Sequence, residues 1–242
     1  MAQEKQLRDI LDNVKVYRGV ERIGGFTLDV DKALKLMEGI GKKRADKFRI
    51  DDDNRWAYTQ LLKWLFGDPT MQAFSPDSLK EGRTQIIPGR LDAGIYIAGT
   101  TGTGKSWAME LLLEVSRTYQ TMIRLGGQEM RLHYPCLRAE DIWEIASTED
   151  GPLREYKNKP LLCIQDLGSE PVSDAVRMGT RREPIRQILE ARGDRDNLIT
   201  MITSNFGIEA PEIEKRYTNR VVSRLKGMCN LLVMNGTDRQ TI

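Results

Sequence analysis

The chain has 242 residues, of which 40% are hydrophobic and 30% are charged, and its 37 basic and 35 acidic side chains leave a net charge of +2. This length suits one large domain, or one domain with a small appendage, and the composition excludes a disordered, collagen-like or mucin-like chain. The near balance of charge excludes a strongly basic, histone-like binder, although it is compatible with a local basic patch.

The cysteine and histidine content and the length of the apolar runs exclude further classes of protein. The three cysteines, Cys136, Cys163 and Cys229, cannot all pair, and their apolar neighbours indicate buried thiols in a reducing compartment. The single histidine, His133, leaves too few ligands for a zinc site. The sequence starts without an apolar signal-peptide core, and no apolar run approaches the roughly 18 residues of a membrane span. We therefore expect a soluble, cytoplasmic protein with no membrane partner.

The first third of the sequence predicts helices followed by a loop. The expected helices cover about residues 4–18, 29–38 and 53–66, the second of them capped by Asp29 or Asp31. Gly67, Asp68 and Pro69 stop the third helix. Residues 68–92 are rich in proline and glycine, and they predict a loop with little regular structure.

The rest of the sequence alternates short apolar runs with helical stretches. The predicted strands are Gly94–Gly99, Tyr134–Arg138, Leu161–Leu167, Leu198–Ser204 and Leu231–Met234, and the predicted helices cover about 104–117, 139–147, 184–192 and 212–226. Continuously apolar strands separated by helices are typical of a parallel sheet that is covered on both faces. The sequence therefore predicts an α/β domain over residues 49–242, preceded by a small helical N-terminal region over residues 1–48.

The strongest motif lies between the first of these strands and the helix that follows it. It matches the pattern G-x-x-x-x-G-K-[ST], and its residues are Gly99, Thr100, Thr101, Gly102, Thr103, Gly104, Lys105 and Ser106. Glycines let backbone N–H groups converge on phosphate oxygens, and a helix N-terminus adds a positive dipole end. Lys105 would reach the β- and γ-phosphates of ATP, and the Ser106 hydroxyl would bind Mg²⁺. The motif predicts a nucleotide site.

The strand over Leu161–Leu167 has an unusual end. A P-loop ATPase needs a carboxylate there to hold Mg²⁺, and usually a second one to polarise the attacking water. This strand instead carries Gln165 followed by Asp166. Asp166 is the candidate metal partner, general base, or both, whereas the neutral Gln165 amide can contact only a metal-bound water and adds no charge. The alternative is that Asp166 merely caps the turn at Leu167-Gly168. We expect near-normal ATP binding and slow or conditional hydrolysis.

Two polar positions further along the chain could complete a catalytic site. The strand Leu198–Ser204 leads into Asn205, whose amide could orient the water that attacks the γ-phosphate, although asparagine is also a common turn residue. Arg220 and Arg224 have the i, i+4 spacing that places them on one helix face. Arg220 could act as an arginine finger on ATP bound to a neighbouring subunit, and the alternative is a solvated basic face.

The order of these motifs resembles a known family. The segments GTTGTGKS, LLCIQDLG, TSN and NRVVSR, followed by a terminal strand, are similar to the AAA+ helicase loaders of DnaC/DnaI type and to the related IstB transposition helpers. The resemblance covers about residues 50–240. It implies an AAA+ P-loop NTPase fold with the parallel sheet order 5-1-4-3-2 and without a C-terminal lid. It also implies that the loop leading into the helix at Asp53-Asn54 borders the adenine pocket. Gln165 departs from the family, which normally has an acid there.

The same resemblance implies a function. It indicates an ATPase that uses ATP and Mg²⁺, forms a homo-oligomer and assembles a replicative helicase on DNA, with residues 1–48 docking to the helicase. An IstB-like ATPase that regulates a transposase is the alternative within the family. Two alternatives lie outside it: an ATP-bound switch module with negligible hydrolysis, which Gln165 favours, and a small-molecule kinase, which would need an arginine-rich lid.

One candidate for contact with single-stranded or duplex DNA lies in the segment 139–160. Related loaders have an inserted helix there that touches single-stranded DNA. The candidate residues are Arg154, Tyr156, Lys157 and Lys159, which combine positive charge with one aromatic ring. A solvated surface loop with nearby acidic residues is the alternative interpretation.

A second candidate for DNA contact lies near the N-terminus. Residues 34–45 resemble a helix-hairpin-helix in which Gly39-Ile40-Gly41 forms the turn and Lys42, Lys43 and Arg44 add charge. The alternative is that the glycines only close a helix end, without any contact to DNA.

Overall fold

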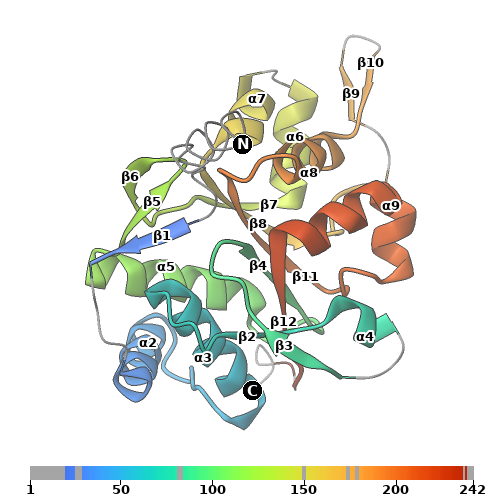
Figure 1. The fold of residues 1–242 in the computed structure, drawn as a ribbon. Helices are drawn as coiled ribbons and strands as arrows, with labels where there is room; N and C mark the ends of the chain where they lie inside the picture. Colours follow the sequence, from blue (N-terminus) through green and yellow to red (C-terminus); the bar gives the residue numbers. More distant parts are fainter. Residues whose placement is uncertain are drawn as a thin grey trace, which may run out of the picture.

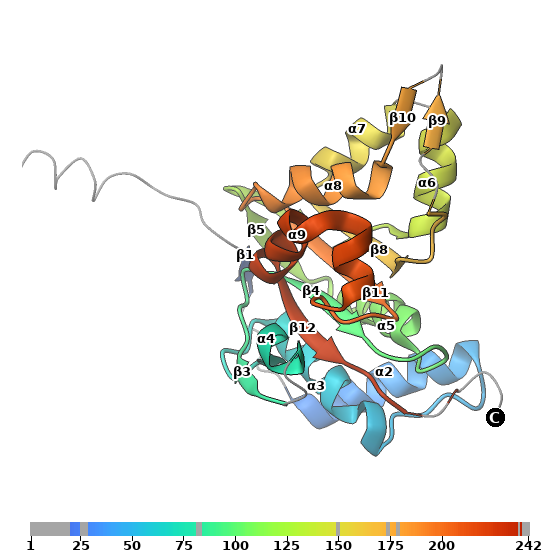
Figure 2. The same cartoon turned by 90° about the vertical axis from the view of Figure 1, so that its right-hand side faces the viewer.

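The structure is a computed structural model that describes residues 20–24, 29–80, 84–148, 151–172, 175–177, 180–236 and 238. The helix expected over residues 4–18 lies outside these ranges. Two perpendicular views show a central sheet between two layers of helices (Figures 1 and 2). The sheet is mostly parallel, which confirms the α/β class that the sequence predicts. Within the described residues, every helix is too short or too polar to cross a membrane.

The central sheet contains strands from the whole length of the described chain. They are β2 (Gln72–Phe74), β3 (Ile86–Pro88), β4 (Gly94–Ala98), β7 (Cys136–Arg138), β8 (Leu161–Leu167), β11 (Ile199–Ser204) and β12 (Cys229–Val233). Their order is β3-β2-β12-β4-β11-β8-β7. The strands from β12 to β7 are parallel to their neighbours, and β2 and β3 add to the edge in antiparallel fashion. Counted in chain order, the parallel strands stand as 5-1-4-3-2, so the carboxyl ends of β4, β11 and β8 lie side by side.

Helices cover both faces of this sheet (Figure 2). One layer contains α2 (Val30–Arg44), α3 (Asp52–Phe66) and α5 (Lys105–Tyr119), and the other contains α6 (Ala139–Thr148), α7 (Gly151–Asn158), α8 (Pro184–Gly193) and α9 (Pro211–Met228). Ile95 and Ile97 of β4 belong to the first hydrophobic cluster, and Tyr96 and Ala98 belong to the second. Because successive strand side chains face opposite ways, a strand covered on both faces must be apolar throughout.

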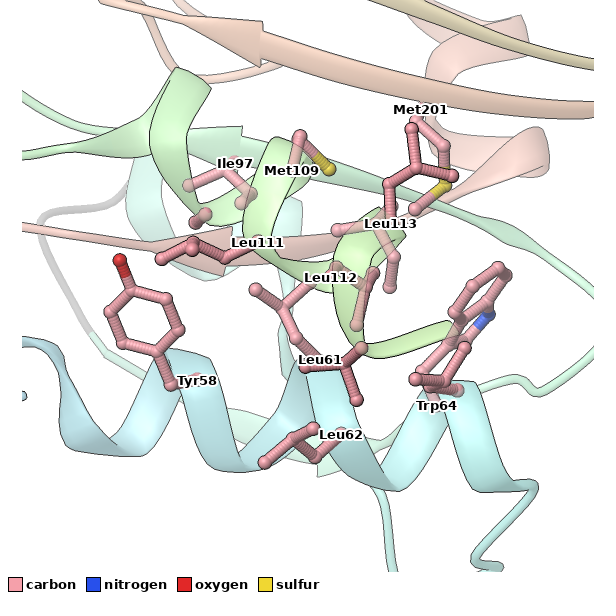
Figure 3. Close-up of a cluster of buried hydrophobic side chains, with 14 of the residues drawn as sticks. Tyr58, Leu61, Leu62, Trp64, Ile97, Met109, Leu111, Leu112, Leu113 and Met201 are labelled. Atoms are coloured by element: carbon pink, nitrogen blue, oxygen red, sulfur yellow. The ribbon is translucent and has the colours of Figure 1, made fainter. Parts of the chain in front are cut away.

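The contact between α3 and α5 anchors the first layer (Figure 3). Leu61 of α3 and Leu111 and Leu112 of α5 are completely buried. Each such side chain contributes about 2–3 kcal/mol when it leaves water. Trp64 packs beside them, and its indole N–H donates a hydrogen bond of 2.7 Å to the carbonyl oxygen of Ala93. This packing holds α5, and therefore the residues at its start, in a fixed position.

The described N-terminal residues pack against the same body. Leu34 and Met37 of α2 belong to the cluster that contains α3 and α5. Arg22 donates hydrogen bonds to the carbonyl oxygens of Trp64 and Leu91, at 2.7 and 3.0 Å, and burial lowers the pKa of its guanidinium to about 10. The division of the chain at residue 48 stays a prediction.

Several short strands were not predicted by the sequence. β1 (Val20–Ile23), β5 (Met122–Leu125) and β6 (Gln128–Arg131) form an antiparallel sheet beside α5, and β9 (Ala175–Arg177) pairs with β10 (Thr180–Arg182) in a hairpin that projects from the body in Figure 2. Strands of three or four residues carry too short an alternation to be recognised from the sequence.

The prediction of a loop over residues 68–92 is wrong. This segment contains β2, β3 and, between them, α4 (Pro76–Lys80). Pro76 occupies the first turn of α4, where a missing N–H costs nothing, and Pro88 ends β3 on the edge strand of the sheet. These prolines mark the ends of elements, whereas the prediction treated them as a sign that no element forms.

The helix-hairpin-helix interpretation of residues 34–45 is also wrong. Gly39, Ile40 and Gly41 lie inside the continuous helix α2, so they form no turn. Packing explains the second glycine, because a Cβ on Gly41 would lie only 2.2 Å from the ring of Phe48. The glycine therefore permits a close contact between a helix and an aromatic ring, and it forms no phosphate-binding hairpin.

Candidate functional site

The G-x-x-x-x-G-K-[ST] residues form a tight loop between β4 and α5. Gly102 and Gly104 have φ angles of +81° and +91°, in the left-handed region that glycine adopts without strain. Gly104 is the N-cap of α5, so the helix begins at Lys105. The Thr103 hydroxyl closes the loop by donating a 2.9 Å hydrogen bond to the carbonyl oxygen of Thr100. The free N–H groups of the first helical turn thus face the inside of the loop, where an anion is stabilised.

A cavity of about 830 Å³ opens at this loop. Its walls include all loop residues from Thr101 to Ser106, and also Gln165, Asp166 and Asn205 at the carboxyl ends of β8 and β11. Its size falls within the range of roughly 300–1,000 Å³ that is usual for small-molecule sites. The structure therefore brings together the phosphate loop and the polar residues that the sequence singled out on two other strands.

Lys105 is the charged centre of the cavity. Its side chain is 5% exposed, and its Nζ donates hydrogen bonds of 2.8 Å to the carbonyl oxygen of Thr100 and to Oδ1 of Asn205. Burial lowers the pKa of the Lys105 ammonium, and the negative charge of Asp166 opposes this shift. Because the Asn205 oxygen already accepts from Lys105, the Asn205 amide N–H₂ group is the part that can donate to a phosphate or a water.

Asp166 faces the start of α5. Its Oδ1 accepts a hydrogen bond of 3.3 Å from the hydroxyl of Ser106, and its backbone N–H donates 2.9 Å to Oγ1 of Thr203. Asp166 has a φ of +55°, a left-handed conformation that aspartate tolerates better than most residues. The following turn is closed by its backbone, because the N–H of Ser169 donates to the Asp166 carbonyl oxygen. The carboxylate is thus turned toward the phosphate loop and does not cap the turn.

The pair of Ser106 and Asp166 fits a magnesium ion in the presence of a nucleotide. Both side chains offer oxygen atoms, which Mg²⁺ prefers, and they lie at the helix N-terminus where phosphates would sit. No group of three or more His, Cys, Asp or Glu side chains that could hold a metal occurs in the described part of the chain. Since Mg²⁺ usually keeps several waters and binds through one or two carboxylates plus substrate phosphates, a larger cage is not required.

Gln165 points toward α5 and contacts a residue that the sequence analysis missed. Its Nε2 lies 3.4 Å from Oε1 of Glu110 and 3.5 Å from the carbonyl oxygen of Ser106. The other Glu110 oxygen, Oε2, accepts a hydrogen bond of 2.5 Å from Arg44 of α2. Glu110 also lines the cavity. The signal that could have found it is its position four residues after Ser106, which places both on one face of α5.

The far wall of the cavity is formed by the segment between α2 and α3 together with the first turns of α3. Phe48, Arg49, Asn54 and Tyr58 line it. The Phe48 ring stacks on Trp107 of α5, with ring centroids 5.5 Å apart and an interplanar angle of 22°. The cavity therefore has a polar end at the phosphate loop and a partly aromatic end at the start of α3. The resemblance implied this second position for an adenine pocket.

The two arginines of α9 lie outside this cavity. Arg220 is exposed, and within the described residues it has no ion-pair partner. Arg224 is bound to Asp194, whose Oδ1 accepts from Nε at 3.0 Å and from the Nη2 group at 2.5 Å. The helix predicted over residues 212–226 is present as α9, with a kink at Thr218, whose φ is +75°. This kink lies before Arg220, so Arg220 and Arg224 both belong to the second half of α9.

The candidates for DNA contact also lie outside the cavity. Arg154, Tyr156 and Lys157 are on α7, Lys159 follows it, and Lys42 and Lys43 are on α2. Lys157 donates a hydrogen bond of 2.8 Å to Gln187, and Lys159 forms an ion pair of 2.5 Å with Glu155. Tyr156 packs against the second hydrophobic cluster. Lys42 pairs with Glu38 at 2.7 Å. Several of these side chains thus have partners within the chain, and DNA contact stays a prediction.

Comparison with known proteins shows what the fold resembles. No protein-family model and no curated protein matches the sequence. The solved structure of a proposed primosome component from Streptococcus pyogenes serotype M3 is similar over 78% of this chain and 83% of that chain, with a TM-score of 0.50 and 18% sequence identity. The chain therefore shares its fold with that component.

Two further structures are similar over the same share of this chain. The DnaC helicase loader has a TM-score of 0.49 and 18% identity, with 78% of this chain and 94% of that chain covered. DnaI has a TM-score of 0.49 and 17% identity, with 78% and 89% covered. Both are proteins of the type that the sequence motifs resemble.

Proposed function

We propose that this chain is an AAA+-type ATPase that works as a nucleotide-gated assembly factor in DNA replication, like the DnaC-type helicase loaders. The observation that carries the proposal is the convergence of Lys105, Asp166 and Asn205, from three different elements, on one cavity at the phosphate loop. The order of the sequence motifs and the fold shared with a proposed primosome component support the choice of replication as the process.

In the proposed reaction, a water attacks the γ-phosphorus of ATP in line with its bond to the β-phosphate oxygen. That bond breaks, and ADP is the leaving group. The loop N–H groups and the Lys105 ammonium bind the phosphates, and the Asp166 carboxylate accepts the proton of the water. The Asn205 N–H₂ group holds the water or the γ-phosphate in position. Ser106 and Asp166 would hold Mg²⁺, which would supply positive charge beside the phosphates when bound.

Two features of the proposal concern neighbouring molecules. Arg220, which is exposed and away from its own cavity, acts on ATP held by an adjacent copy of the chain, so the active form is a homo-oligomer. Residues 1–48 dock to a replicative helicase, and the basic residues around α7 contact single-stranded DNA. ATP binding then controls how copies assemble, and hydrolysis resets the assembly.

The decisive experiment measures ATP binding and turnover of the full chain with and without single-stranded DNA and the candidate helicase. We expect calorimetry to detect ATP binding, light scattering to detect a larger assembly with ATP, and turnover to rise with the partners present. The absence of ATP binding would refute the proposal. Binding to a transposase in place of a helicase would assign the chain to the IstB-like alternative.

A second candidate is an ATP-bound switch with negligible hydrolysis, which the neutral Gln165 favours. Turnover by the unmodified chain separates the two. An ATPase loses a measurable rate in both Lys105→Ala and Asp166→Asn, whereas a switch has no rate to lose, although Lys105→Ala still abolishes its ATP-dependent assembly.

A further inference from the structure

The proposed nucleotide site has a metal side, by which we mean the part of the cavity around Ser106 and Asp166. This side lacks one acidic group, yet the cavity contains a carboxylate that belongs to none of the sequence motifs. Gln165 occupies the position on β8 where an acid is expected, which leaves Asp166 as the carboxylate in contact with Ser106. Glu110 lines the same cavity from α5. Its side chain is 32% exposed, so it is neither buried in the core nor free in solvent.

Helix geometry brings Glu110 to the metal side of the site. It follows Ser106 by four residues in α5, so the two side chains occupy the same helix face. Gln165 reaches both of them, because its Nε2 lies 3.4 Å from Oε1 of Glu110 and 3.5 Å from the Ser106 carbonyl oxygen. Ser106 is therefore flanked by Asp166 on one side and by the contact between Gln165 and Glu110 on the other.

The neutral Gln165 and the charged Glu110 are chemically complementary. A glutamine amide donates hydrogen bonds through its N–H₂ group, whereas an ionised carboxylate only accepts them. An aspartate at position 165 would therefore meet the Glu110 carboxylate as a like charge, and one of the two would be disfavoured. Gln165 instead holds Glu110 in place, so two carboxylates, Asp166 on β8 and Glu110 on α5, lie near Ser106.

We propose that Glu110 is the second anionic group of the Mg²⁺–nucleotide site and that Gln165 positions it there. This inference rests on the proposed nucleotide site and adds a residue to it. Glu110 supplies the negative charge that the end of β8 lacks, and it acts on the metal's bound water. The consequence is that the chain binds nucleotide in a Mg²⁺-dependent way in spite of its glutamine.

Arg44 allows the charge of Glu110 to be separated from its ion pair. Arg44 donates to Oε2 of Glu110 at 2.5 Å, and its guanidinium lies over the ring of Trp107, 5.1 Å from the ring centroid. Replacing Arg44 removes the ion pair and keeps the carboxylate, whereas replacing Glu110 removes both. The two substitutions therefore make a matched pair for the ion pair, since both remove it and only Glu110→Gln removes the carboxylate.

The test measures binding of a fluorescent, non-hydrolysable ATP analogue to the full chain at increasing Mg²⁺ concentrations. The readout is the Mg²⁺ concentration that gives half-maximal binding, compared with binding in EDTA. We expect Glu110→Gln to raise this concentration roughly tenfold or more, as is usual when a group that supports a metal ligand is lost. Binding in EDTA should change little. Arg44→Gln should leave the Mg²⁺ requirement unchanged or lower it.

A double variant tests whether the charge itself is what matters. In Glu110→Gln with Gln165→Asp, the carboxylate returns to the end of β8 while the amide moves to α5, and we expect the Mg²⁺ requirement to return to within about threefold of the unmodified chain.

The proposal is overturned if Glu110→Gln keeps the unmodified Mg²⁺ requirement, or if Arg44→Gln raises it as much as Glu110→Gln does. Failure of the unmodified chain to bind the analogue at any Mg²⁺ concentration refutes the proposed function itself, a result distinct from the other two. The melting temperature of each variant confirms that it is folded.

Discussion

The two sides of the cavity are built in different ways. The phosphate side comes from consecutive residues, 99–106, whose backbone closes on itself through Thr103 and Gly104. The side where we propose that the metal binds is assembled from separate elements, with Glu110 on α5, Asp166 at the end of β8 and Arg44 on α2. A consecutive motif specifies its own geometry, whereas an assembled one depends on how the sheet and helices pack. A residue of the assembled side is therefore easily missed in the sequence, and Glu110 is such a residue.

The largest effect should come from the carboxylate on the assembled side. Asp166→Asn removes the proton acceptor, and asparagine tolerates the left-handed backbone of this position, so the fold is preserved. We expect the turnover of ATP at saturating Mg²⁺ to fall by about 10³-fold, while nucleotide binding in EDTA changes little. Steady-state phosphate release and calorimetry measure the two quantities. A variant with unchanged turnover would remove Asp166 from the reaction.

On the phosphate side, Lys105→Ala should abolish useful nucleotide binding. The loss of charge-assisted hydrogen bonds to the phosphates should weaken binding by about 100-fold, or about 2.7 kcal/mol. The matched control is Lys35→Ala, since Lys35 is an exposed lysine of α2 and should leave binding unchanged. Calorimetric titration with ATP measures both variants. Equal affinities would show that the loop does not hold the phosphates.

The far wall should depend on tertiary packing. Gly41→Ala places a Cβ against the Phe48 ring, and the overpacking should lower the free energy of unfolding by about 2 kcal/mol. Gly39→Ala is the control two residues earlier in the same helix. Nothing lies within 4 Å of a Cβ there, so alanine should raise the free energy of unfolding by about 0.5–1 kcal/mol. Urea unfolding of the two variants measures both changes in the free energy of unfolding, which should have opposite signs. Equal changes would contradict the packing interpretation.

The smallest of these effects should come from Asn205, which links the two sides. Its oxygen accepts from Lys105, and its remaining N–H₂ group is available to the γ-phosphate or the water. Asn205→Ala should lower turnover by about tenfold, or about 1.4 kcal/mol, because one orienting hydrogen bond is lost. Single-turnover measurements at saturating ATP isolate this step. If only the affinity for ATP fell, Asn205 would support Lys105 and take no part in catalysis.

The sequence by itself determined the parts that depend on neighbouring residues. The phosphate loop, the parallel strands around it and the polar residues Asp166 and Asn205 follow from spacing and from apolar periodicity. Sequence patterns also located α5 and α8 to within a few residues, because helical periodicity over ten or more residues is a strong signal.

Tertiary structure decided the rest. The role of Gly41 depends on the ring of Phe48, which lies in the following loop. Pro88 is compatible with a strand because β3 lies at the edge of the sheet, a position that tertiary structure decides. The contact between Gln165 and Glu110 joins residues 55 positions apart. No periodicity records such a contact, because it exists only once packing of α5 on the sheet has brought two separate elements within hydrogen-bonding distance.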